Sequence, residues 1–266
     1  MLRSELGLTF GRMRTRGLLL VVAAIPALLA LAVRLSGGPD GGHGPTFLDQ
    51  VSRNGVFAAL AGLTVVIPFF LPLAVSVVAG DTIAGEASQG TLRYLLVRPV
   101  GRTRLILSKF VTAVVFCLVS ALAVALTGLL VGWALFPVGS VVTLSGTTIG
   151  AWDGIYRSLG AATLVGASMI GLVSIGVLIS TFTESPVGAI AATAGIAILS
   201  QILGAIPQLE SIHFLLFTQE WMSFGDLMRT PVMWDNIIEN LILQACWTSV
   251  FLLAAWARMT TRDVLG

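Results

Sequence analysis

The chain has 266 residues, of which 56% are hydrophobic and only 11% are charged. Soluble globular proteins carry about a quarter of charged residues, so this composition excludes a soluble domain and indicates an integral membrane protein. The net charge of +2 is little informative, because in a membrane protein the placement of the cations matters more than their sum.

Residues 1–16 are predicted to form an amphipathic helix on the membrane surface. Leu2, Leu6, Phe10 and Met13 recur at helical spacing, and three arginines precede the first apolar run. The alternative is a cleaved signal peptide over residues 1–35. The apolar run from Gly17 to Val33 is long for such a peptide and has no small-residue exit, so a retained helix is favoured.

Six apolar segments reach the roughly 20 residues that a helix needs to cross a bilayer. They are predicted at 17–35, 56–79, 106–132, 158–180, 186–206 and 237–257. No segment alternates with a period of two, and a spanning backbone must satisfy its own hydrogen bonds. The fold class is therefore an all-α integral membrane protein, with residues 1–266 forming a single transmembrane domain.

The placement of the cations predicts the orientation of the spans. With the N-terminus in the cytoplasm, eleven cations fall on the inner side and four, Arg34, Arg53, Arg157 and Arg229, on the outer side. This distribution satisfies the positive-inside rule. We expect a multi-pass protein of a bacterial-type plasma membrane with both termini in the cytoplasm.

The outer segment 207–236 is apolar on one face but cannot cross the membrane. Phe217, Trp221 and Phe224 lie on that face, while Glu210, Glu220 and Asp226 interrupt it. Interfacial or re-entrant helices are expected there. The three aromatic residues are the candidates for an outer gate.

Prolines and glycines predict two features of the spans. Pro68 and Pro72 each remove a backbone donor from the second span, which should therefore be bent or locally unwound. They are hinge candidates, although proline is also commoner in membrane helices in general. Gly128 and Gly132 form a GxxxG pattern that permits close helix approach.

Several kinds of chemistry are missing from the sequence. The sole lysine, Lys109, is followed by Phe110, so no GxxxxGK[ST] phosphate loop exists and any ATP must bind to another chain. No HExxH or GxSxG motif is present, and no predicted span carries an ionisable group near its middle, which disfavours an ion-coupled carrier. His213 with Met222, Met228 and Met233 offers soft metal ligands, but their irregular spacing favours packing. We expect no catalytic, metal or cofactor site.

The segment 81–110 holds the densest polar chemistry of the chain, including five of its cations. Span two is predicted to end near Gly80, and Gly90 to interrupt the helix. Residues 91–97 then form a short helix that Pro99 ends. On charge alone, the arginines could simply contact anionic lipid.

The arrangement of this segment is similar to the D-x-I-x-x-E-x-x-x-G-T-L-x-x-L-L-x-x-P-x-x-R loop of permeases of ATP-binding-cassette (ABC) transporters of the type-2 exporter class. Arg262, Asp263 and Val264 resemble the basic ending of that family. The matching and neighbouring loop residues, which the resemblance implies couple the permease to its ATPase, are Asp81, Glu86, Gly90, Thr91, Leu92, Arg93, Leu95, Leu96, Pro99 and Arg102.

The resemblance implies a permease subunit that has no enzyme activity of its own. Two such subunits, more often identical than different, would pair with two separate ATPase subunits that bind ATP and Mg²⁺. Residues 81–105 would form the coupling loop, with Glu86 as a main polar contact, and residues 1–16 the connecting helix. An exported hydrophobic or amphipathic substrate, such as a drug, lipid or peptide antibiotic, would be expected. No nucleic acid partner is expected.

Two other functions remain open at this point. One is a secondary carrier or channel that works without ATP, for which an unwound second span could bind an ion through its carbonyl oxygens. The other is a membrane scaffold that recruits an ATPase without moving a substrate.

Overall fold

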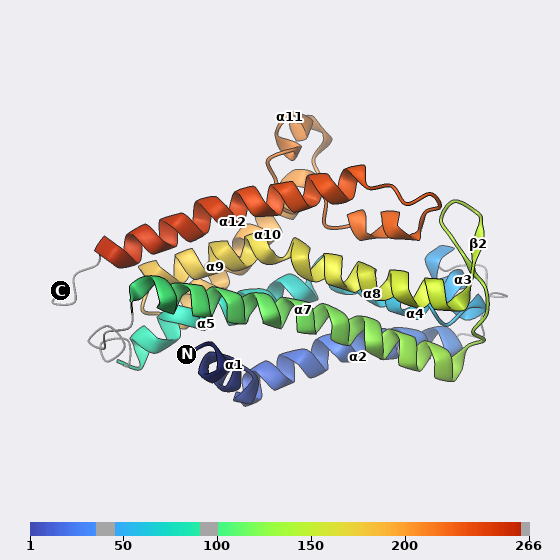
Figure 1. The fold of residues 1–266 in the computed structure, drawn as a ribbon, viewed down its shortest axis with the longest axis horizontal. Helices are drawn as coiled ribbons and strands as arrows, with labels where there is room; N and C mark the ends of the chain where they lie inside the picture. Colours follow the sequence, from blue (N-terminus) through green and yellow to red (C-terminus); the bar gives the residue numbers. More distant parts are fainter. Residues whose placement is uncertain (36–45, 91–100, 262–266) are drawn as a thin grey trace.

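The computed structural model describes residues 1–35, 46–90 and 101–261 and is an elongated bundle of helices (Figure 1). Six helices are long and apolar enough to cross a membrane. The described strands, β1 (Val141–Val142) and β2 (Thr148–Ile149), form a two-residue hairpin ladder. The prediction of an all-α multi-pass membrane protein is confirmed.

The long helices lie side by side and run roughly along the long axis of the bundle (Figure 1). In chain order they are α1 (Leu2–Gly11), α2 (Met13–Leu35), α3 (Thr46–Arg53), α4 (Phe57–Val66), α5 (Phe70–Ser88), α7 (Arg102–Leu135), α8 (Ala151–Ser168), α9 (Ile170–Phe182), α10 (Pro186–Gly204), α11 (Glu210–His213) and α12 (Asp235–Thr261), with 3₁₀ helices η2 (Pro207–Leu209) and η3 (Ser223–Met228).

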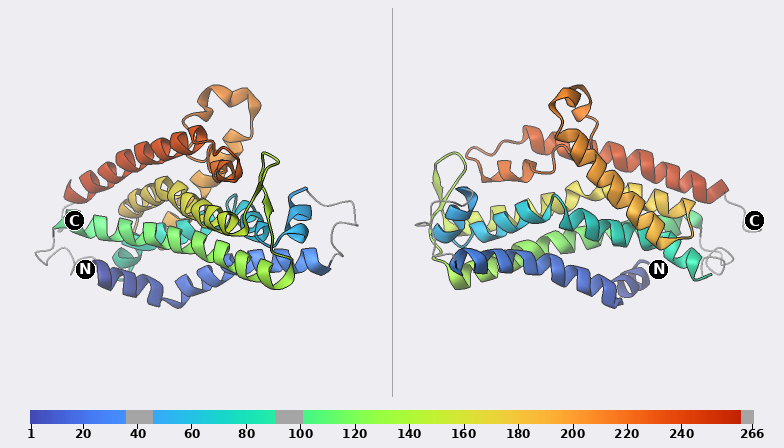
Figure 2. Two further views of the ribbon diagram at one scale, coloured as in Figure 1. Left: turned by 45° about the vertical axis from the view of Figure 1, so that its right-hand side comes forward. Right: turned by 180° about the vertical axis from the view of Figure 1, so that it is seen from behind.

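The bundle has two distinct ends. Helix α1, the end of α5, the start of α7 and the end of α12 lie at one end, which we name the terminal end (Figures 1 and 2). The β1–β2 hairpin and α3 lie at the other, the hairpin end. The first described helix and the last turn of α12 therefore lie at the same end of the bundle, as an even number of spans requires.

The second predicted span is broken at the position of its first proline. Helix α4 ends at Val66 and α5 begins at Phe70, so Pro68 lies in the break, whereas Pro72 is buried in the first turn of α5. The side chain of Gln201 on α10 donates a hydrogen bond to the Pro68 carbonyl at 2.7 Å. An amide from a neighbouring span thus satisfies a carbonyl that the interrupted helix leaves open. The role of either proline as a hinge stays a prediction.

The GxxxG pair lies where α7 packs closely on the second span. A Cβ atom on Gly132 would overlap the carbonyl group of Gly55, and one on Gly128 would overlap the backbone of Ala59. Small residues on both sides therefore let the two backbones approach each other, as the pattern predicts. Any larger residue at Gly128 or Gly132 would separate α7 from α4.

The outer segment between α10 and α12 turns back within the depth of the bundle. Helix α10 ends about halfway along the long axis, α11 projects sideways there, and η3 continues toward the hairpin end (Figure 1). Side chains at the tip, such as Phe214 and Leu215, are exposed, whereas Phe217 further along is buried. We name residues 207–234 the re-entrant segment; whether its helices are re-entrant or interfacial in the membrane stays a prediction.

Candidate functional site

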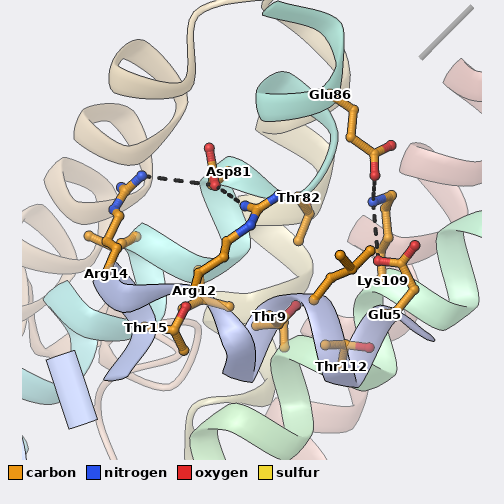
Figure 3. Close-up of a pocket in the computed structure, with 14 residues that line it drawn as sticks. Glu5, Thr9, Arg12, Arg14, Thr15, Asp81, Thr82, Glu86, Lys109 and Thr112 are labelled. Carbon is orange, nitrogen blue, oxygen red and sulfur yellow. Dashed lines mark hydrogen bonds and ion pairs between the residues drawn. The ribbon is translucent and has the colours of Figure 1, made fainter. Parts of the chain in front are cut away.

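Charged side chains from three separate parts of the sequence meet at the terminal end (Figure 3). We name Glu5, Arg12, Asp81, Glu86 and Lys109 the charge cluster. They come from α1, the Arg12 junction that follows it, α5 and α7, and line a pocket between these elements. The cluster joins the N-terminal surface helix to the two spans that flank residues 91–100.

Lys109 is the centre of one half of the cluster. Its side chain is only 4% exposed, and its Nζ lies 2.5 Å from Oε1 of Glu86 and 3.5 Å from Oε2 of Glu5. A buried ammonium group is tolerated only when it is paired. Lys109 therefore requires carboxylates from both α1 and α5, which fixes α1 against the end of the bundle.

Asp81 forms the other half of the cluster with the residues at the start of α2. Its Oδ2 accepts a hydrogen bond from the Arg12 guanidinium at 2.7 Å, and Arg14 lies at 3.9 Å. Asp81 and Glu86 are five residues apart, so they project about 140° apart around α5. One carboxylate consequently faces α2 while the other faces α7.

Helix α5 extends beyond its predicted end. The sequence placed the end of the span near Gly80, but the helix continues through Asp81 and Glu86 to Ser88. The polar residues in these two turns remain helical because their carboxylates have partners on neighbouring helices. The chain then leaves the helix at Gly90, whose φ of +69° is readily adopted only by glycine.

Arg102 begins α7 but does not belong to the charge cluster, because its side chain binds the end of α12. Its Nη1 donates to the carbonyl oxygens of Met259 and Thr260, at 2.9 and 2.8 Å. A cation at this position satisfies open carbonyls and is favoured by the dipole of α12. Arg102 thereby connects the start of α7 to the end of the last span.

The structure thus accounts for four of the ten predicted coupling residues. Asp81 and Glu86 lie in the charge cluster, Gly90 ends α5, and Arg102 contacts α12. The others lie outside the described residues, and so does the terminal motif; they are Thr91, Leu92, Arg93, Leu95, Leu96, Pro99, Arg262, Asp263 and Val264. The role of all ten residues in coupling to an ATPase stays a prediction.

A second polar assembly lies along one face of α12, toward the hairpin end. We name Asn236, Asn240, Gln244 and Trp247 the amide ladder, since three of the four donors are amides. Each donates to the re-entrant segment, to Asp226, Ser223, the Phe217 carbonyl and the Leu215 carbonyl respectively. The spacing of three or four residues places all four on one face.

The amide ladder also reaches the kink between α8 and α9. Asn240 donates to Ser168 Oγ at 2.7 Å, and Gln244 Oε1 accepts from the Gly171 backbone at 3.2 Å. Met169 separates these two helices, so Gln244 binds a backbone N–H in the first turn after the kink. The last span therefore holds the fourth span and the re-entrant segment together.

The three gate candidates belong to the re-entrant segment and are buried in the bundle. Phe217, Trp221 and Phe224 are 2%, 2% and 5% exposed. The Phe217 ring makes edge contacts with Trp221 and with Trp247 of the ladder, with centroids 5.7 and 5.3 Å apart. Aromatic packing thus closes this region in the described state. Whether it opens as a gate stays a prediction.

Arginines fix the last part of the re-entrant segment to the hairpin end. Arg157 on α8 donates to the carbonyl oxygens of Leu227 and Arg229, at 2.9 and 2.8 Å. Arg229 in turn pairs with Asp226 at 2.7 Å. The η3 end of the segment is therefore held by charge-assisted bonds.

Glu220 lies near two other carboxylates in this region. Its partial burial, and then the negative charges of Glu239 and Asp226, raise the pKa of Glu220 above its ordinary value.

Within the described part of the chain, no group of three or more His, Cys, Asp or Glu residues could hold a metal ion. His213 Nε2 instead lies 3.2 and 3.1 Å from the carbonyl oxygens of Leu203 and Ile206.

Sequence reasoning missed both the pairing partners and the ladder. Lys109 and Glu5 are 104 residues apart, so only the packing of α1 on α7 brings them together. The ladder did leave a signal, because Asn240 and Gln244 lie four residues apart in the last predicted span and Asn236 lies four residues earlier, next to its start. A search for amides, rather than only for ionisable groups, within the spans would have found it.

Comparison with known proteins gives two relatives of one kind. A stretch of 92 residues is 37% identical to the "Probable ABC transporter permease protein NosY" of Pseudomonas aeruginosa. A stretch of 93 residues is 33% identical to the protein of the same description from Stutzerimonas stutzeri. Each match covers 35% of this chain and 31% of the relative.

A family model covers far more of the chain than these relatives do. It matches residues 21–265, from within α2 to the penultimate residue, and so includes the amide ladder and Asp81, Glu86 and Lys109 of the charge cluster. Glu5 and Arg12 lie before the matched range. The chain belongs to the family described as "Protein of unknown function (DUF2705)".

Proposed function

We propose that this chain is the membrane subunit of an ATP-driven ABC transporter. It would pair with a separate ATPase, which binds ATP and Mg²⁺, and with a second membrane subunit, more often an identical copy. The terminal end would face the cytoplasm, in line with the excess of cations among its residues. The names of the two relatives and the resemblance of residues 81–102 support this proposal.

The charge cluster is the observation that carries the proposal furthest. It joins α1 to the end of α5 and the start of α7, the two helices that flank residues 91–100. A force on that loop would therefore act on the surface helix and on two spans together. An energy-coupling contact needs such a rigid connection.

The structure modifies the expected role of Glu86. The resemblance implies a polar contact with the ATPase, yet the Glu86 side chain is only 17% exposed and bonds to Lys109. We infer that Glu86 acts as a positioning residue, holding the base of the loop, while residues 91–100 contact the partner. This division of roles can be tested separately for each group.

The proposed cargo is a hydrophobic or amphipathic molecule moved out of the cytoplasm. Helices α2, α10 and α12 leave most of their apolar surface uncovered, with between 17% and 28% of their spanning windows buried. Such surfaces accommodate lipid, a second subunit or an apolar substrate. No described span offers a charged group at its middle that would favour an ionic cargo.

Purification from native membranes tests the proposal directly. We expect an ATP-binding chain to accompany the protein in a fixed ratio, with ATP hydrolysis that a transported substrate stimulates. Leu95→Asp in the predicted coupling loop should abolish this association. Leu144→Asp in the hairpin loop, where Leu144 is 60% exposed, is the matched control and should leave it intact.

Two results would contradict the proposal. Transport by the isolated chain in liposomes, driven by an ion gradient without ATP, would establish a secondary carrier or channel. Stable association with an ATPase but no substrate movement, and no stimulation by any compound, would instead establish a scaffold.

A further inference from the structure

An open groove of about 440 Å³ lies at the terminal end, on a different side of α7 from the charge cluster. It is bounded by Met1 and Leu2 on one side and by the first turns of α7 on the other. The lining residues are Met1, Leu2, Gly101, Thr103, Arg104, Leu107, Ser108 and Val111. No role in the proposed transport cycle uses this groove.

The groove changes from cationic to apolar along its length. Arg104, Leu107 and Val111 are spaced by three and four residues on α7, so they form one stripe along the helix. Leu107 and Val111 are 45% and 36% exposed. The cation thus lies in the first turn of α7, at the terminal end, and the exposed apolar side chains lie further along the helix.

Arg104 differs from most of the cations around it. Among the described residues it forms no ion pair and donates no side-chain hydrogen bond, and it is exposed. The neighbouring cations are occupied by partners: Arg12 by Asp81, Lys109 by Glu86, and Arg102 by carbonyls of α12. Arg104 is therefore the side-chain cation among the described lining residues that is available to an external anion.

The position of a tryptophan indicates the depth of the groove mouth. Trp256 on α12 is 43% exposed, and its Nε1 donates to Thr103 Oγ1 at 2.8 Å. Partly exposed tryptophans gather at the level of the lipid headgroups. Thr103 and Arg104 consequently lie at the membrane interface, with Leu107 and Val111 below it.

We propose that this groove binds an anionic phospholipid, with the headgroup phosphate at Arg104 and an acyl chain along Leu107 and Val111. The order of charge and apolar surface along α7 matches the order of the two parts of such a lipid. A soluble phosphate would leave the apolar walls unused, so lipid is the occupant that fits the whole groove. The site requires only that the chain is embedded in a membrane.

Native mass spectrometry of the purified chain tests the site with phosphatidylglycerol and phosphatidylcholine as probes. We expect phosphatidylglycerol to bind more tightly, and Arg104→Gln to weaken it about fivefold, the effect of one cation near an anionic headgroup. Arg53→Gln, at the exposed Arg53 of the hairpin end, is the matched control and should have no effect. Val111→Trp, which fills the groove, should weaken both lipids.

The proposal is overturned if the two lipids bind equally, if Arg104→Gln has no effect, or if Arg53→Gln has the same effect. Displacement of the lipid by glycerol phosphate alone would also overturn it, since a headgroup without chains would then suffice. Circular dichroism of each variant must retain the wild-type helix signal. Arg104 is exposed, so its replacement should not affect folding.

Discussion

The two polar assemblies of this bundle are built from different chemistry. The charge cluster at the terminal end uses carboxylates, guanidinium groups and an ammonium, whereas the amide ladder nearer the hairpin end uses neutral amides and an indole. Ion pairs near an interface can exchange partners with water or with another protein. The bonds of the buried Asn240 and Gln244 to neutral groups have no such competitor. The charge cluster can therefore exchange its partners, whereas the amide ladder keeps one arrangement.

The largest effect is expected from removing the buried lysine of the charge cluster. Lys109→Met leaves the carboxylates of Glu5 and Glu86 in a buried site without their common cation. Breaking a buried ion pair in this way costs roughly 3–5 kcal/mol. We expect the free energy of unfolding in detergent to fall by this order, with α1 becoming sensitive to protease.

The double variant Lys109→Met with Glu86→Gln separates charge from packing. It removes both members of the closer pair, so it should recover part of the stability that the single variant loses. If the double variant were as unstable as Lys109→Met alone, the lysine would act through packing and the cluster would not be electrostatic.

A smaller but salt-independent effect is expected at the amide ladder. Asn240 is fully buried and bonds to Ser168, Ser223 and Gln244. Interhelical bonds of this kind contribute about 1–2 kcal/mol in model helices. Asn240→Leu should therefore reduce the free energy of unfolding by this amount and make the re-entrant segment exchange amide hydrogens faster.

Ser249→Leu on the same helix is the control for this change. Ser249 is exposed, and its hydroxyl donates to the Ala245 carbonyl within α12. Its replacement should therefore leave the segment unaffected. An unchanged exchange rate in Asn240→Leu would show that the other contacts of the segment, such as the Phe217 ring contacts and the Arg157 hydrogen bonds, are sufficient to hold it.

The sequence predicts the spans better than it predicts what joins them. Hydropathy reveals each apolar run, and Pro68 indicates the break in the second span, because both signals are local. The pairing of Glu5 with Lys109 depends on how α1 packs against α7, which no local pattern encodes. For the same reason, the sequence predicts that Asp81 and Glu86 follow the end of the span, whereas their partners keep them in α5.

The stability contributed by the Asp81–Arg12 ion pair of the charge cluster should depend on salt, unlike that of the amide ladder. Asp81→Asn removes its pair with Arg12, whose side chain is 47% exposed. Exposed pairs contribute about 0–1 kcal/mol and are screened by salt. The loss in unfolding free energy should thus be small in dilute buffer and vanish in concentrated salt. Asp153→Asn, at the exposed Asp153 of α8, provides the control. A loss of unfolding free energy that salt does not change would show that the Asp81 contact is shielded from solvent, as the buried bonds of the amide ladder are.

The smallest effect concerns protonation of the re-entrant segment. Because burial and the neighbouring carboxylates raise the pKa of Glu220, the folded chain holds this proton more tightly than the unfolded chain does. Stability is therefore lost as the pH rises from the ordinary carboxyl value of 4.5 through the raised pKa. Glu220→Gln should be slightly more stable than wild type at neutral pH, and this advantage should vanish in acid. The exposed Glu210, replaced in the same way, should give no such pH-dependent difference. A Glu220→Gln variant with an unchanged pH profile would mean that water screens this carboxylate, leaving the ladder as the main hold on the segment.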